Sequence, residues 1–66
     1  MSDMPIVYRK ILDFLNTNEG RNRTDIEADC VRSFRITKDE LKKAMDEMSM
    51  WGTTVERTHR KIKIRD

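Results

Sequence analysis

Two adjoining stretches decide the fold of this chain: TKDELKKAMDEMSMWG at residues 37–52 and TTVERTHRKIKIRD at residues 53–66. The first has apolar side chains at helical spacing and stops at a glycine, which is typical of an amphipathic helix followed by a left-handed residue. The second is rich in β-branched residues and alternates between apolar and charged positions, which is typical of strands. We therefore predict a helix over about 38–51 and a β-hairpin over about 53–65.

The start of this helix carries its own signal. In the tetrapeptide TKDE, the Thr37 hydroxyl can accept a hydrogen bond from the Glu40 amide while the Glu40 side chain reaches back to the Thr37 amide, which is a capping box. Ile36 and Leu41 have the spacing of a hydrophobic staple across the same turn. The side chains of this helix that we expect to face the core are Leu41, Ala44, Met45, Met48 and Trp51.

A first helix is predicted over about 5–16. Pro5 suits a first helical turn, where its missing N–H costs nothing, and apolar residues then recur at helical spacing. They are Val7, Ile11, Phe14 and Leu15. The stretch NTNEG at 16–20 has the composition of a turn, and residues 21–23 are either loop or a minimal edge strand.

A second helix is predicted over about 25–34. TDIE at residues 24–27 has the capping-box pattern of Thr24 and Glu27, and Ile26, Cys30 and Phe34 lie on one stripe. We interpret Cys30 as a small buried hydrophobe, since a reactive thiol needs an exposed, electropositive setting. Two capping boxes thirteen residues apart, with a tight junction between them, indicate a helix-turn-helix.

In the hairpin, alternation places Val55, Ile62 and Ile64 toward the core and leaves Lys61, Lys63 and Arg65 on the other face. The connection Thr58-His59-Arg60 contains no Gly, Asn or Asp, so we expect a looser tip in place of a tight primed turn.

Three helices and a hairpin in this order resemble the winged helix-turn-helix superfamily over nearly the whole chain. The resemblance is carried by residues 24–34, the turn at 35–37, residues 41–52 and residues 53–65. It implies an α+β fold in one domain spanning residues 1–66, with a C-terminal two-stranded wing. It also implies DNA binding as the commonest use of the fold, with protein-binding and RNA-binding members as minorities.

The composition of the chain limits the kinds of chemistry that it can support. Sixty-six residues make one small domain, and one Cys and one His cannot form a disulfide or a zinc site within one chain. No nucleophile–base set, phosphate loop or paired acids in an apolar setting is present, so we expect no enzyme activity and no cofactor. No basic signal-peptide start or membrane-length apolar run is seen, so we expect a cytoplasmic or nucleoid-associated protein.

Charge is distributed unevenly along the chain. The formal net charge is +2, but residues 1–34 carry five basic and six acidic side chains, and residues 35–56 carry four and five. Residues 57–66 carry five basic side chains against Asp66 alone, so the positive excess lies in the hairpin. Such asymmetry indicates an anionic partner for that end.

In the winged-helix arrangement the third helix faces the major groove and the wing flanks it. The candidate nucleic-acid contacts are Arg35, Thr37, Lys38, Lys42, Lys43, Arg57, His59, Arg60, Lys61, Lys63 and Arg65. The third helix has no Arg, Asn or Gln for bidentate base contacts, so we expect the wing to carry most of the contact. Arg60 at its tip suits a narrow, A·T-rich minor groove.

Simpler interpretations exist for the same residues. Three pairs of the third helix, Asp39–Lys43, Lys42–Asp46 and Lys43–Glu47, have the i,i+4 spacing of an ordinary solvated face. Lysines on an edge strand can serve only to discourage aggregation, and His59 can be a solvated loop residue.

The sequence thus favours a small DNA-binding winged-helix protein, a transcriptional or chromatin-type regulator that binds duplex DNA and forms a homodimer or joins a protein partner. The alternative is a protein-interaction module, such as an accessory subunit or inhibitor of a transcription or replication complex. RNA binding is a third hypothesis. We expect no small-molecule substrate and no membrane association.

Overall fold

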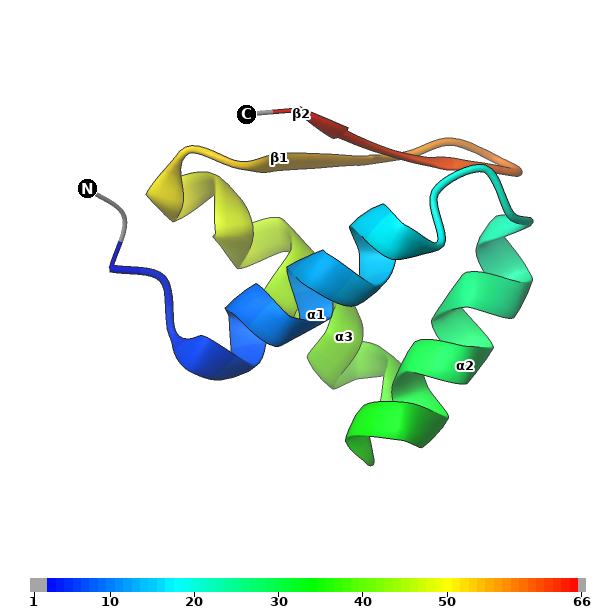
Figure 1. Cartoon of the computed structure of the whole chain (residues 1–66), viewed down its shortest axis with the longest axis horizontal. Coiled ribbons are helices and arrows are strands. Elements are labelled where there is room, and N and C mark those ends of the chain that lie inside the picture. The colour runs from blue at the N-terminus through cyan, green and yellow to red at the C-terminus, as the bar shows by residue number, and fades with distance from the viewer. Residues whose placement is uncertain (1–2, 66) are drawn as a thin grey trace.

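The computed structural model describes residues 3–65, and this part of the chain forms three α-helices followed by a two-stranded antiparallel hairpin (Figure 1). The hairpin lies across one side of the helices, as Figure 1 shows. This α+β layout matches the winged-helix arrangement and confirms the predicted fold class. The elements are α1 (Ile6–Thr17), α2 (Arg23–Phe34), α3 (Lys38–Glu47), the 3-10 helix η1 (Met48–Trp51), β1 (Thr54–Arg57) and β2 (Ile62–Arg65).

The capping box of α3 is confirmed. The Glu40 amide donates to the Thr37 hydroxyl at 3.0 Å, and the Thr37 amide donates to Glu40 Oε1 at 2.8 Å. The predicted helix over 38–51 has the right extent, but its last turn tightens into η1, as helix ends often do to satisfy terminal carbonyls. Gly52 then adopts a left-handed conformation with φ 86°, as expected.

The capping box predicted for α2 is wrong. Asn22 is the N-cap, and its side-chain oxygen accepts from the Thr24 amide at 2.9 Å. Glu27 does not reach back to the cap but pairs with the Arg23 side chain at 2.9 Å. Since Asn is at least as good an N-cap as Thr, the upstream residue takes the position and the helix begins at Arg23, earlier than predicted.

A left-handed residue ends α2. Arg35 has φ 53°, and it is the one non-glycine with positive φ among residues 3–65. Its own N–H and that of Ile36 both reach the Val31 carbonyl, the latter at 3.2 Å. This bond pattern satisfies a carbonyl at the helix end and turns the chain into α3 within two residues, which makes the helix-turn-helix.

All elements contribute to one core. Its fully buried side chains are Ile11, Leu15, Ile26, Cys30, Leu41, Met48 and Ile62. Cys30 is buried as predicted, and desolvation, followed by the nearby charge of Glu27, raises the pKa of its thiol to about 11. Val7 departs from the prediction: it lies on the predicted stripe of the first helix, yet it is 55% exposed.

The hairpin presents the predicted faces. Val55 pairs with Ile64 and Arg57 with Ile62 in the antiparallel register; Val55 and Ile62 are buried, and Ile64 is half-buried. The Thr58 amide donates to the Lys61 carbonyl at 2.9 Å, closing the connection.

The tip is not a primed turn. Neither His59 nor Arg60 has positive φ, and primed turns require it. The Lys61 amide donates to the Thr58 hydroxyl at 3.1 Å, so a side chain takes part in closing the tip.

Replacement of Leu41 by Ala should lower the free energy of unfolding by about 2–5 kcal/mol, because Leu41 is 1% exposed and its loss leaves a cavity. Urea unfolding followed by circular dichroism measures this. Met50→Ala is the control: Met50 is 72% exposed, so its replacement should change stability by less than about 0.5 kcal/mol. Equal losses in the two variants would contradict the described core.

The corrected cap of α2 gives a second test. Asn22→Ala should destabilise the protein by about 0.5–2 kcal/mol, since it removes the acceptor of the Thr24 amide. Thr24→Ala should be neutral or slightly stabilising, because Thr24 lies inside the helix, where Ala is favoured. The reverse order of the two effects in thermal melts would restore Thr24 as the cap.

Candidate nucleic-acid interface

The tip of the hairpin is fixed to the start of α2. The Arg23 amide donates to the Arg60 carbonyl at 2.8 Å, and the Arg23 guanidinium donates to the Thr58 carbonyl at 2.9 Å. The Lys61 ammonium donates to the Gly20 carbonyl. Of residues 21–23, for which loop and edge strand were both open, residues 21 and 22 form a loop and Arg23 is the first residue of α2, whose backbone amide bonds to the hairpin.

A second attachment joins the hairpin to α3. Arg57 shares the inner face of the hairpin with Ile62, and its guanidinium forms an ion pair with Asp46 of α3. The Arg57 side chain is 20% exposed, whereas Asp46 is 52% exposed. Arg57 therefore links the wing to α3 through this ion pair.

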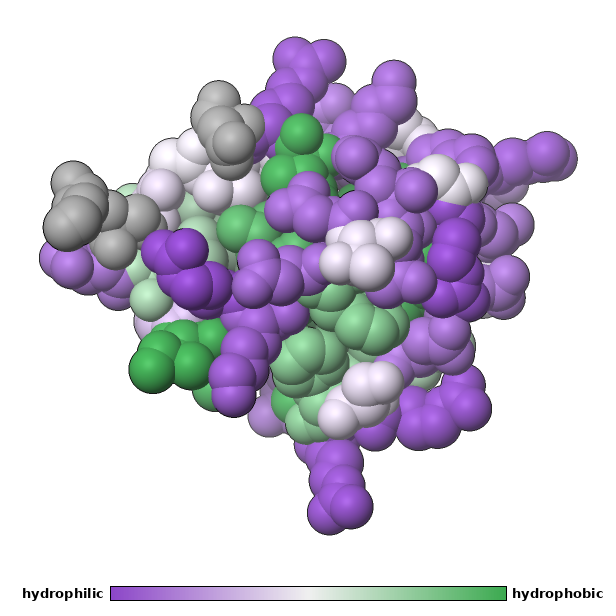
Figure 2. Space-filling model, in the orientation of Figure 1, coloured by the Kyte–Doolittle hydropathy of each residue, from purple (hydrophilic) through white to green (hydrophobic). Residues whose placement is uncertain are grey.

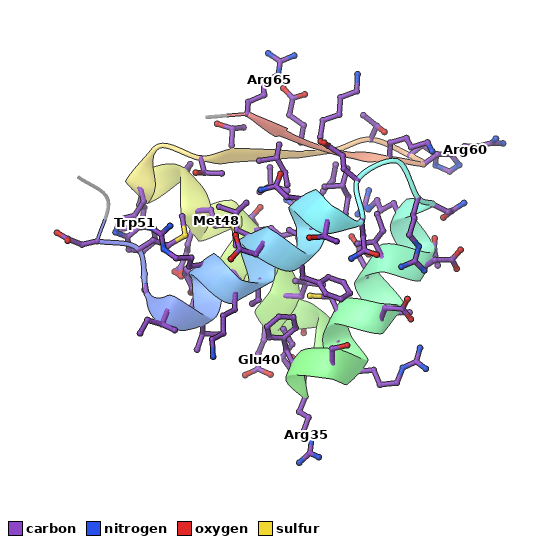
Figure 3. All side chains as sticks on the ribbon, viewed as in Figure 1. Arg35, Glu40, Met48, Trp51, Arg60 and Arg65 are labelled. Carbon is purple, nitrogen blue, oxygen red and sulfur yellow. The ribbon has the colours of Figure 1, made fainter. Side chains whose placement is uncertain are left out.

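The other predicted wing residues differ in exposure and in whether they pair with an acidic side chain. Arg65 pairs with Glu56 across the hairpin at 3.3 Å, and both side chains are exposed. Arg60 and Lys63 are exposed and have no acidic partner among residues 3–65. Arg60 projects from the tip into solvent, as Figure 3 shows. His59 is also exposed at the tip.

The three i,i+4 pairs of the solvated-face interpretation of α3 do not form among the described residues. Asp46 pairs with Arg57 of β1, and Glu47 accepts a hydrogen bond from the Tyr8 hydroxyl of α1. That hydrogen bond, followed by burial and the carboxylate charge, raises the pKa of Tyr8. The lysines left without an acidic partner within residues 3–65 are Lys38, Lys42 and Lys43.

Two of these lysines border a groove between α3 and the hairpin. We call it the α3–hairpin groove; its lining residues are Arg23, Glu27, Lys38, Asp39, Leu41, Lys42, Met45 and Arg57. Four basic and two acidic residues line it, so its formal charge is +2 (four minus two). The N-terminal end of α3 adds the positive end of a helix dipole beside Lys38.

The remaining candidates lie elsewhere. Lys43 borders the opposite flank of α3, where that helix meets α1. Arg35 extends from the end of α2 that is farthest from the hairpin (Figure 3). The Thr37 hydroxyl is used by the helix cap. The structure therefore brings Lys38, Lys42 and Arg57 to one groove beside the wing, but it does not bring Arg35 or Lys43 there.

One groove residue, Arg23, was missed by the sequence-based prediction. Its position near the start of a helix was visible in the sequence, but its role depends on Thr58 and Arg60, which are more than thirty residues away in the chain. Local pattern carries no signal for such a contact.

Comparisons with protein-family models, with curated proteins and with solved structures find no match to this chain. No group of three or more His, Cys, Asp or Glu side chains within residues 3–65 is placed to hold a metal ion. In the same part of the chain, every helix is too short or too polar to cross a membrane.

A double-mutant cycle tests the attachment of the wing to α3. Arg57→Ala, Asp46→Ala and the double variant should show a coupling energy of about 0.2–1 kcal/mol, the range of partly exposed ion pairs. The same cycle on Arg65 and Glu56 is the matched control, because the Arg65 side chain is 69% exposed and the coupling of this pair should be near zero. A coupling no larger for Arg57 and Asp46 than for the control would contradict the described attachment.

Proposed function

We propose that this protein binds duplex DNA, with the phosphate backbone running along the α3–hairpin groove and the wing tip reaching the neighbouring groove of the duplex. One observation carries the proposal: Lys38 and Lys42 border this groove without an acidic partner in the described chain. Unpaired lysines on a groove of net positive charge are available to neutralise phosphates, whereas paired ones would first have to lose their partners.

In this proposal the wing makes fewer contacts with DNA than its number of basic residues indicates. Arg57, Lys61 and Arg65 have partners within the chain, so Arg60 and Lys63 are the wing cations that remain available among residues 3–65. A guanidinium at the tip suits phosphates or a narrow minor groove. Since the tip is fixed to α2 by Arg23, Arg60 is presented at a defined place beside the groove.

The proposal includes little reading of base sequence. The outer side of α3 displays Asp39 and Asp46, and the helix offers no Arg, Asn or Gln for bidentate base contacts. Backbone contacts position a protein on DNA but do not specify a sequence. A regulator or chromatin-type protein that recognises duplex shape, with a preference for A·T-rich sites through Arg60, fits these side chains best.

Single-stranded RNA fits less well. The four aromatic side chains are half-buried and pair with one another: Tyr8 with Trp51 at 5.8 Å and Phe14 with Phe34 at 5.9 Å between ring centroids. They offer no exposed ring on which bases could stack. The protein-interaction alternative is favoured by one observation, the acidic outer line of α3 formed by Asp39 and Asp46.

The test is binding to a labelled duplex, followed by fluorescence anisotropy as a function of salt. The logarithm of the affinity should fall linearly with the logarithm of salt concentration, and each lost phosphate contact should reduce the slope by about 0.9. Lys38→Ala, Lys42→Ala and Arg60→Ala should each do so with little change in melting temperature, because all three side chains are exposed.

The matched control is Lys10→Ala. Lys10 is also an exposed cation, but it belongs to α1, which contributes no residue to the α3–hairpin groove. Its affinity and salt slope should equal those of the wild type. Absence of any duplex binding at low salt would end the DNA proposal and leave the protein-interaction alternative.

A further inference from the structure

The side of α3 that faces away from the hairpin has apolar surface that the chain leaves uncovered. A second groove, the α1–α3 groove, lies between these helices and is lined by Val7, Tyr8, Ile11, Ile36 and Ala44, with Glu40 and Lys43 at its charged edge. Val7 is 55% exposed and its neighbour Ile6 is 71% exposed. Figure 2 shows several separate apolar areas on the side of the molecule where α1 lies, with hydrophilic side chains between them.

This exposure is unexpected for so small a domain. A chain of 66 residues has little core, so leaving aliphatic side chains in water forgoes stabilisation that it needs. Exposed apolar groups beside a groove, surrounded by polar ones, are typical of an interaction surface. Ile6 and Val7 also occupy adjacent positions of one helix, which provides a rigid element for docking.

The charged residues at the edge of the α1–α3 groove indicate what kind of partner binds there. The edge of the groove carries one acid, Glu40, and one base, Lys43, which do not pair with each other within residues 3–65. A strongly acidic or strongly basic partner would meet a like charge at one of the two. A second copy related by a twofold axis that passes between these two positions brings Glu40 of each chain to Lys43 of the other, so both are satisfied.

Glu40 can do this while it caps α3. Its Oε1 accepts from the Thr37 amide, and Oε2 has no hydrogen bond within the described chain. Lys43, one turn further along α3, is exposed. We propose that the α1–α3 groove is the interface of a homodimer, closed by Ile6 and Val7 and framed by two reciprocal Glu40–Lys43 pairs.

This inference is independent of DNA binding, since the interface and the α3–hairpin groove lie on opposite flanks of α3. The test therefore uses the full chain without nucleic acid. Sedimentation equilibrium from about 10 μM to about 1 mM should show a mass rising from 7.9 kDa toward twice that value, as mass action requires. A mass that stays at 7.9 kDa over this range overturns the proposal and leaves the groove to a different partner.

Two lysine substitutions compare exposed apolar side chains at two places on the surface. Val7→Lys should weaken self-association by at least about tenfold, because it brings two unpaired charges into the interface. Met50→Lys is the control: Met50 is 72% exposed but lines neither groove, so this variant should associate like the wild type. Equal effects of the two substitutions would show that general hydrophobicity, and not this surface, drives association.

Charge reversal tests the twofold geometry. Glu40→Lys and Lys43→Glu should each weaken their own dimer, because both reciprocal pairs become like-charged. An equimolar mixture of the two variants should associate more tightly than either alone, since every pair is then of opposite charge. Failure of the mixture to recover association contradicts the reciprocal contact. Circular dichroism confirms that each variant is folded, and Lys43→Glu, which leaves the cap of α3 intact, keeps the test decisive if Glu40→Lys unfolds.

Discussion

A hairpin of two four-residue strands is marginally stable by itself, so everything that the wing does depends on its attachment to the helices. Buried Val55 and Ile62 provide the apolar part of that attachment. Arg23 and Arg57 provide the polar part, one holding the tip to α2 and the other holding β1 to α3. These two basic side chains, together with Lys61, whose ammonium donates to the Gly20 carbonyl, place the wing, and the exposed Arg60 gains a defined position beside α3.

The same attachment changes the electrostatics of α3. An i,i+4 pair on an exposed helix contributes only about 0.2–0.5 kcal/mol, so a partner from another element displaces it easily. Asp46 pairs with Arg57 and Glu47 bonds to Tyr8, and the lysines that sequence spacing assigned to these acids have no acidic partner within the described part of the chain. A helix whose charges balance in composition therefore presents a basic flank toward the hairpin. The net charge of +2 hides this local separation.

The sequence predicted the fold class, the order of the elements, most of the core and the inner and outer faces of the hairpin, because these follow from periodicity, caps and glycine. It failed where two local patterns compete. Residues 24–27 and residues 37–40 both match the capping-box pattern, yet only the second forms one, since Asn22 stands ahead of the first. It gave no sign of the contacts that Arg23 and Arg57 make within the chain, because their partners are set by packing between distant segments. The sequence thus predicted which types of residue the candidate site contains better than it predicted how they are arranged.

The position of α3 explains how so short a chain can present two different surfaces. One stripe of the helix, centred on Leu41 and Met48, is buried. The stripe on one side of it carries Lys38 and Lys42 toward the hairpin, and the stripe on the other side carries Glu40 and Ala44 toward α1. Because a helix places neighbours in sequence on different faces, the adjacent lysines 42 and 43 fall on opposite flanks. A groove with a net positive charge and a largely apolar groove with no net charge are therefore compatible on opposite flanks of a single helix.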